Sequence, residues 1–155
     1  MIQITISAAG ALGRLNTLPN DLAARLASVV ATLAQRLYDR VEDNLSGAVL
    51  QRRSGRLASS ITQRIDGLSA LVGFDPAVVP YGAAQEFGAD LRAHLIAAKN
   101  ARALSFVVGG RRVFAKRVMS PGAHLPERSF LRSALAELAP DIGAAIAVAV
   151  ADTVQ

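Results

Sequence analysis

The chain begins with a stretch whose side chains alternate strictly between apolar and polar. Residues 2–7 read IQITIS, so every isoleucine is followed by a polar residue. This period of two is typical of a β-strand with one buried face, and it predicts a strand over residues 2–6. The small residues from Ala8 to Thr17 then predict a loop.

A helical pattern follows this loop. Pro19, Asn20 and Asp21 are residues that commonly open a helix, with Asn20 as the N-cap and Asp21 in the first turn. The pattern predicts a long helix that ends at about Gly47. Its apolar residues recur at spacings of three and four: Leu22, Leu26, Val29, Leu33, Leu37, Val41 and Leu45.

The middle of the chain favours strands. Residues 69–74, SALVGF, predict one strand, and residues 104–119 contain two β-rich runs on either side of Gly109 and Gly110. Adjacent glycines supply the positive φ angles of a two-residue hairpin turn, so we expect a hairpin there. Residues 89–103 mix charged and apolar side chains without a clear period. They predict a short helix or a flexible excursion that becomes ordered on contact with a partner.

A second long helix is expected from Ser129 to near the C-terminus. Pro140 lies inside it, and a proline removes one helical hydrogen bond, so we expect a kink or a break over residues 137–139. The apolar stripe of this helix consists of Leu131, Leu135, Leu138, Ile142, Ile146 and Val150. Together these elements predict an α+β fold in one domain, residues 1–155. In it a small antiparallel sheet packs against the long N-terminal helix, and the C-terminal helix lies alongside.

Composition narrows the classes of function. The 155 residues include no cysteine, which excludes disulfides, thiolate catalysis and cysteine-ligated zinc. We see no secretory leader at the N-terminus, and the most apolar run, residues 142–151, is shorter than the ~20 residues that span a bilayer. The sequence therefore predicts a chain without a membrane partner.

The net charge of +5 suggests an acidic neighbour, either nucleic acid or an acidic protein surface. The basic residues fall in three groups, and only Phe106 and Phe114 lie close to them as aromatic residues that could stack on bases. A basic nucleic-acid-binding module is therefore an alternative function. A toxin–antitoxin type of binder is a more distant one.

Catalytic patterns are absent from the sequence. His94 and His124 have neither the spacing nor the neighbouring acids of a metal site, and no GxSxG elbow or phosphate-binding loop occurs. Glu86 and Asp90 are four residues apart, but the chain has no tryptophan and only seven aromatic residues to line a sugar cleft. We expect no enzyme activity, no metal and no cofactor.

The stretch YGAAQEFGAD, residues 81–90, allows two interpretations. In the first, Tyr81 and Phe87 belong to the core, with Phe87 against Phe130 and Gly88 ending a helical turn. In the second, the stretch contacts another molecule. Because a carboxylate beside a buried ring is costly unless it is paired, Glu86 should meet an arginine or backbone amides, within the subunit or across an interface.

Four stretches in a fixed order carry a resemblance: SGRLASSI at 54–61, ALVGF at 70–74, YGAAQEFGA at 81–89 and LPERSFLRSALAEL at 125–138. Together they resemble the head–tail connector proteins of long-tailed bacteriophages, also called neck, tail-completion or minor tail component proteins. The resemblance spans residues 20–150. Gly82 stands where that family usually has alanine, and Arg128 and Ser129 stand where it more often has an Arg/Gln-Pro pair. These departures leave the subfamily open, whether neck and tail-completion or virion-morphogenesis.

The resemblance implies a structural virion protein at the junction of head and tail, present in the host cytoplasm during assembly. Such a subunit assembles with itself as a ring, and a hexamer is one size that the resemblance allows. Its other partners would be connector, stopper, tail-terminator or tail-tube proteins, and DNA would pass through the lumen without sequence-specific binding. The expected contact residues are Glu86, Tyr81, Arg92, Arg102, Arg111 and Arg112. The expected core residues are Phe87, Phe130, Leu131, Leu57 and Ile61.

Overall fold

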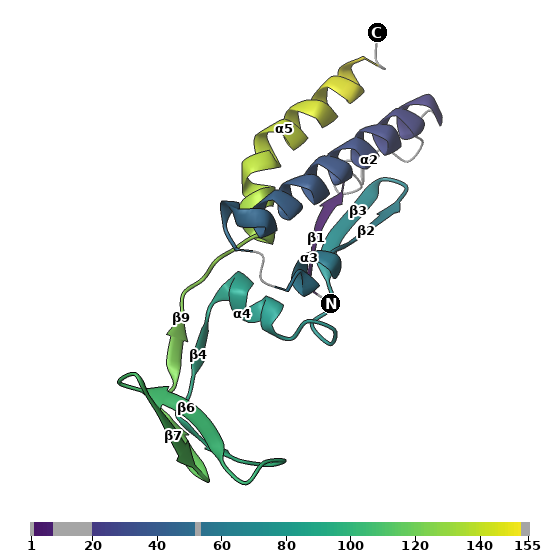
Figure 1. Ribbon diagram of the computed structural model, residues 1–155. Coiled ribbons are helices and arrows are strands. Elements are labelled where there is room, and N and C mark those ends of the chain that lie inside the picture. The colour runs from purple at the N-terminus through teal and green to yellow at the C-terminus, as the bar shows by residue number, and fades with distance from the viewer. Residues whose placement is uncertain (1, 8–19, 52–53, 153–155) are drawn as a thin grey trace.

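The protein folds as an α+β structure with a two-layered body and a projecting β arm (Figure 1). A computed structural model describes residues 2–7, 20–51 and 54–152. The loop expected over residues 8–17 lies outside the described residues, as do Pro19 and the side chain of Asn20. The predicted fold class is confirmed.

The body contains a three-stranded antiparallel sheet in the order β1-β3-β2. Its strands are β1 (Ile2–Ser7), β2 (Thr62–Asp66) and β3 (Ser69–Phe74). The alternation that predicts β1 places Ile4 and Ile6 in the core, and Ile4 lies opposite Val72 of the central strand. The strands predicted over residues 2–6 and 69–74 are both confirmed.

One long helix covers this sheet. Helix α2 spans Asn20–Asp43 and continues as one π-helical turn, η1 (Asn44–Ala48), so it ends close to the expected Gly47. Its predicted apolar face is the packed face, because six of the seven stripe residues are buried and Val29 is half-buried. In Figure 1, α5 runs beside α2, and both helices contact the sheet.

Helix α5 (Leu131–Ala151) packs along α2 and passes through Pro140 as one helix. Of the two expected outcomes at the proline, the break is therefore wrong, and the kink stays a prediction. Anchors on both sides of the proline explain this continuity. Leu138 and Ile142 pack against the core, and Glu137 and Asp141 pair with arginines of α2. Arg40 binds Glu137, and a nitrogen of Arg36 lies 2.6 Å from a carboxylate oxygen of Asp141.

Among the described helices, α5 alone is long and apolar enough to cross a membrane, judged by length and composition. Its mean hydropathy over the most apolar 18-residue window is 1.7. In this structure the helix instead packs beside α2 and is tied to it by the two ion pairs. The expectation that the protein has no membrane partner stays a prediction.

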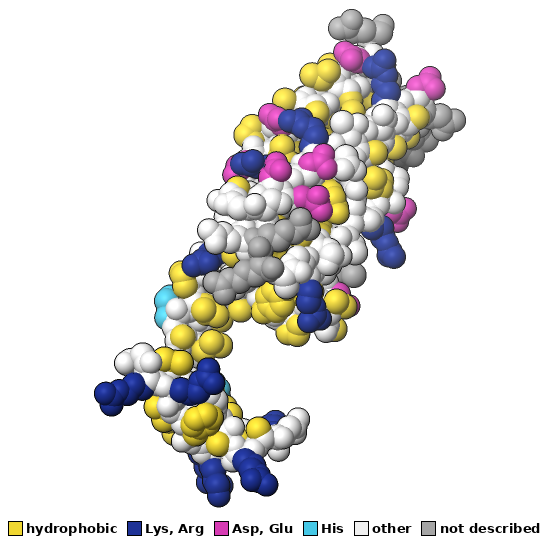
Figure 2. Space-filling model, in the orientation of Figure 1, with side chains coloured by type: hydrophobic (Ala, Val, Ile, Leu, Met, Phe, Trp, Pro, Cys, Tyr) yellow, Lys and Arg dark blue, Asp and Glu magenta, His cyan; other side chains and the backbone are white. Residues whose placement is uncertain are grey.

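The arm, defined here as residues 89–125, consists of three nested two-stranded antiparallel ladders (Figure 1). The ladders are β4–β9 (Ala89–Leu91 with Ala123–Leu125), β5–β8 (His94–Ala97 with Arg117–Ser120) and β6–β7 (Leu104–Val108 with Arg111–Ala115). The helix expected as one alternative for residues 89–103 is therefore wrong, since this stretch contributes β4 and β5. In Figure 2 the arm extends beyond the body and is dominated by hydrophobic and basic side chains.

The predicted hairpin at Gly109 and Gly110 is confirmed as the β6–β7 turn. Both glycines have positive φ angles, 55° and 79°, as a primed turn requires. No atom lies within 4 Å of a side chain built at either position, so only the backbone conformation requires glycine there.

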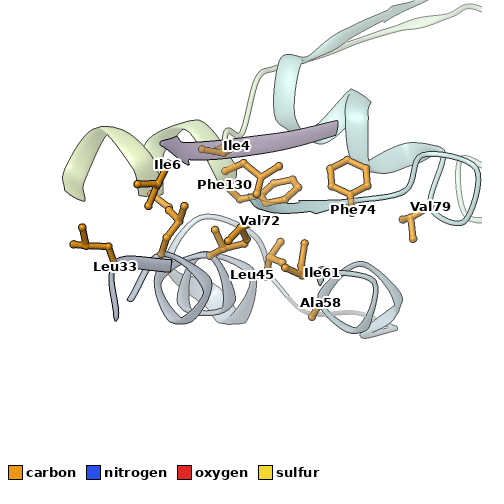
Figure 3. Packing of buried hydrophobic residues seen from close by; sticks show 14 residues of the cluster. Ile4, Ile6, Leu33, Leu45, Ala58, Ile61, Val72, Phe74, Val79 and Phe130 are labelled. Atoms are coloured by element: carbon orange, nitrogen blue, oxygen red, sulfur yellow. The ribbon is translucent and has the colours of Figure 1, made fainter. Parts of the chain in front are cut away.

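The hydrophobic core of the described residues lies in the body, enclosed by α2, α5 and the sheet (Figure 3). Phe74 and Phe130 are fully buried and their ring centroids are 5.8 Å apart. Ile61 and Leu131 are buried as predicted, and Leu57 is half-buried against the same cluster. Phe87 is wrongly predicted as a core residue, because 52% of its surface is exposed. Phe74 takes the place beside Phe130 that was expected for Phe87.

Candidate functional site

The first seven residues of YGAAQEFGAD form a short helix, α4 (Tyr81–Phe87). Gly82 and Glu86 are four residues apart, so they share the face of α4 that is turned into the body, and both are buried. Phe87 follows Glu86 by one residue and therefore points away from that face. This geometry is the physical reason why Phe87 is exposed although it lies inside the motif.

Glu86 is completely buried, and its carboxylate meets the first turn of α5. Oε2 accepts hydrogen bonds from the backbone N–H groups of Phe130 (2.8 Å) and Leu131 (2.9 Å). Oε1 accepts hydrogen bonds from the backbone N–H of Arg132 (3.0 Å) and the hydroxyl of Ser129 (2.8 Å). We call this arrangement of Glu86 with residues 129–132 the α4–α5 junction.

The junction supplies hydrogen-bond acceptors to the N-terminus of α5. The first N–H groups of a helix have no partner within the helix, and Phe130, the N-cap residue of α5, supplies no side-chain cap. Glu86 satisfies three of these donors from a different part of the chain. Its negative charge also lies at the positive end of the helix dipole, which is favourable.

Arg132 balances the buried carboxylate. Its Nε lies 3.3 Å from Oε1 of Glu86, and its terminal nitrogen donates to the backbone oxygen of Glu86 (3.1 Å) and to Glu127 (2.6 Å). The guanidinium also lies over the ring of Phe87, 4.8 Å from the ring centroid. Phe87 is thus partly covered by an arginine at the surface.

These contacts decide between the two interpretations of Glu86. The expectation that it meets an arginine and backbone amides is confirmed, and both lie within the subunit. The expectation that Glu86 contacts another molecule is wrong for the described fold, because the side chain has no exposed surface. Tyr81, at the other end of α4, remains a candidate contact since it is 43% exposed.

Two glycines of the motif have steric roles. A side chain at Gly82 would come within 2.4 Å of the Phe74 ring, so the glycine lets α4 lie directly on the core. This contact accounts for glycine where the resembling family usually has alanine. Gly88 ends α4 with a φ of 72°, as expected, and a side chain there would meet the backbone oxygen of Leu125 at 2.9 Å.

A solvent-exposed groove of about 1000 Å³ lies beside the junction. We call it the α3–α4 groove, because its walls come from η1, α3 (Arg56–Ser59) and α4. Tyr81 and Gln85 line one wall, and Arg128 is held there by its backbone N–H, which donates to the oxygen of Gln85 (2.8 Å). The other described lining residues include Leu45, Leu50, Ser54, Gly55, Arg56 and Leu57.

The structure separates the sequence-predicted contact residues into two places. Tyr81 lies at the groove, whereas Arg92, Arg102, Arg111 and Arg112 are all exposed on the arm. Sequence reasoning missed Asn44, whose buried side-chain amide donates to the backbone oxygen of Phe130 (3.0 Å) and fixes the junction from the side of α2. Asn44 follows Val41 by three residues and directly precedes Leu45, so a polar residue at helical spacing within the apolar stripe was the available signal.

The described residues contain no cluster of three or more His, Cys, Asp or Glu side chains suited to a metal ion. His124 instead hydrogen-bonds Asp90 at 2.6 Å, across the β4–β9 ladder at the base of the arm. Near the α2 surface, burial and the adjacent Glu42 carboxylate raise the pKa of Tyr38, whose hydroxyl donates to Glu42. Each of these groups has a partner within the described part of the chain, and none of them lines the groove.

No protein-family model, curated protein or solved structure matches this chain.

Proposed function

We propose that the protein is a structural subunit of the head–tail junction of a phage or prophage, of the neck or tail-completion type. The observation that carries this proposal is the way in which the four resembling stretches meet. The second supplies Phe74, the third lays Gly82 on that ring and sends Glu86 into the start of α5, and the fourth is that start. The first forms α3 and places Ile61 in the same core.

This arrangement supports the resemblance because residues of different matching stretches bind one another. Glu86 needs the free N–H groups at residues 130–132, and those groups need an acid. The third and fourth stretches form the α4–α5 junction, and the first and second contribute Ile61 and Phe74 to the core cluster that contains Phe130. All four stretches therefore meet in one part of the body.

The α3–α4 groove is the surface that we assign to a protein partner. Its lining combines apolar side chains with Tyr81 and two arginines, Arg56 and Arg128. Tyrosine and arginine are enriched in protein interfaces, where they supply contact area and directed hydrogen bonds. A segment of a connector, stopper, tail-terminator or tail-tube protein, or of a neighbouring copy, would fit this chemistry.

In the proposed assembly, copies of the chain form a ring around the path of the DNA. A ring needs one interface between two different surfaces, repeated until it closes. The body with its groove and the projecting arm are two such different surfaces on one subunit (Figure 1). The subunit would reside in the virion, and in the host cytoplasm until assembly.

Complementation tests this function. A phage with the gene deleted is supplied with the wild-type protein or with Tyr81→Ala, and tailed particles are counted by electron microscopy and by infectious titre. Ile65→Ala is the matched control, because Ile65 is 46% exposed on β2, away from the groove. We expect the deletion to leave separate heads and tails, Tyr81→Ala to lower the yield, and Ile65→Ala to restore it.

Two results would contradict the proposal. One is a full yield of infectious tailed particles from the deletion phage. The other is the absence of the protein from purified virions.

A further inference from the structure

The net positive charge of the protein lies in the arm. Residues 89–125 contain seven basic side chains and one acidic side chain, a formal charge of +6, whereas the rest of the chain contains ten basic and eleven acidic side chains. Figure 2 shows the consequence, since the visible face of the arm carries dark blue side chains and no magenta ones, while the body carries both. The basic residues of the arm are Arg92, Lys99, Arg102, Arg111, Arg112, Lys116 and Arg117.

None of these seven side chains has an ion pair among the described residues. All twelve acidic residues of the sequence are described, so the uncertain segments hold no further side-chain carboxylate for them. The one acid of the arm, Asp90, is bonded to His124. In the body, by contrast, Arg25, Arg36, Arg40 and Arg132 are all paired with carboxylates.

The shape of the arm suits a nucleic-acid groove. Its β6–β7 ladder is a two-stranded antiparallel ribbon, and the major groove of B-form DNA admits such a ribbon. Arg111 and Arg112 directly follow the glycine turn at the tip. Successive residues of a strand point to opposite faces, so the two arginines project from both sides of the ribbon and can reach phosphates on both strands.

The exposed apolar side chains of the ribbon fit the same partner. Phe114 and Val107 are each 66% exposed, and the register places them on the same face as Arg112. In the major groove of a duplex, an apolar side chain such as Phe114 can contact thymine methyl groups while the neighbouring arginine reaches a phosphate. A protein interface would bury the apolar residues but is depleted in charge at its centre, so seven unpaired cations favour nucleic acid.

We propose that the arm binds the phosphate backbone of duplex DNA, with Arg111 and Arg112 at the tip as principal contacts. Binding does not depend on base sequence, because phosphate contacts carry no sequence information. The inference stands on the charge and shape of the arm in a single chain. It does not rest on ring assembly or on the α3–α4 groove.

The test measures binding of the full-length protein to a short fluorescent DNA duplex by anisotropy over a series of salt concentrations. Arg111→Gln with Arg112→Gln removes two tip charges, and Arg25→Gln with Arg64→Gln removes two exposed charges of the body, away from the α3–α4 groove, as the matched control. Each phosphate contact contributes about 0.9 to the slope of log K against log salt, so the tip variant should lower the slope by about 1.8.

We expect the tip variant to weaken binding about tenfold at ~0.1 M salt and the body variant to weaken it about twofold or less. The absence of binding by the wild-type protein at about 0.05 M salt would overturn the proposal. An equal loss in both variants would also overturn it, because attraction would then come from net charge alone. A tip variant that keeps its DNA affinity but no longer supports particle assembly would assign the arm to a protein partner.

Discussion

The body and the arm belong to one chain but are stabilised in different ways. All buried residues lie in the body, where α2, α5 and the sheet enclose the core, and no residue of 89–125 is buried. The arm instead exposes eight large hydrophobic side chains, among them Leu95, Phe114 and Met119. A two-stranded ladder is marginally stable in water unless something covers a face.

This difference shows which region has a core of its own. The body encloses a buried core and caps the N-terminus of α5 with Glu86. The arm is held by ladder hydrogen bonds, and its large apolar side chains stay exposed. Substitutions that remove the same kind of side chain should therefore have very different effects in the two regions.

The largest contrast is expected between two phenylalanines. Phe130→Ala removes a fully buried ring and should lower the free energy of unfolding by about 3–5 kcal/mol. Phe114→Ala removes an exposed ring of the arm and should change it by less than about 0.5 kcal/mol. Urea denaturation of both variants measures the difference. Equal losses would show that the arm contributes to the same cooperative unit as the body.

The second contrast concerns adjacent residues of α4. Glu86→Ala leaves three backbone N–H groups of α5 and the Arg132 side chain without their acceptor, so it should cost about 3 kcal/mol. Phe87→Ala removes an exposed ring with one cation–π contact and should cost about 0.5–1 kcal/mol. Thermal melting of both variants measures the two losses of stability, and Glu86→Ala should show the larger one. A Glu86→Ala variant as stable as the wild type would show that the α4–α5 junction does not stabilise the fold.

The third contrast concerns two glycine-to-alanine substitutions, each of which adds a methyl group. Gly82→Ala places a carbon about 2.4 Å from the Phe74 ring and should cost about 1–3 kcal/mol through overpacking. Gly143→Ala on α5 is the control, because no atom lies within 4 Å of the new side chain and alanine favours a helix. Denaturation should show Gly82→Ala destabilised and Gly143→Ala unchanged or more stable. The reverse order would contradict the packing of α4 on the core.

The smallest change in the free energy of unfolding is expected from deleting most of the arm. Leu91 and Ala123 are opposite each other in the β4–β9 ladder, so an Asn-Gly turn can join them in place of residues 92–122. We expect this shortened chain to unfold within about 0.5 kcal/mol of the full-length protein, because the deleted part holds no buried residue. Circular dichroism at rising temperature measures it. Failure of the shortened chain to fold would show that the arm supports the body.

The same contrast explains how far the sequence predicted the structure. The stripe from Leu22 to Leu45 and the alternation of residues 2–7 each have one period, and burial follows that period directly. The glycine pair at 109–110 fixed a local hairpin. The junction was only half predictable: an acid in an apolar motif had to be paired, but the sequence does not show whether the partners lie within the subunit.

Two errors have the same physical origin. Phe87 was assigned to the core because large aromatic rings are usually buried, yet the short helix α4 turns its Gly82–Glu86 face inward instead. Residues 89–103 lack a period because the strands they form have no buried face. The pattern of apolar residues follows burial within the chain, so it cannot predict segments whose apolar side chains stay exposed.

Hydrogen exchange of the unmodified protein tests the division between body and arm most directly, because it measures the local stability of every segment in one experiment. We predict that the amides of α2, β3 and α5 exchange only on global unfolding. Those of residues 89–125, including the stretch 89–103, should exchange much faster in the free protein and become protected when duplex DNA is added. Equal protection of arm and body in the free protein would contradict the account.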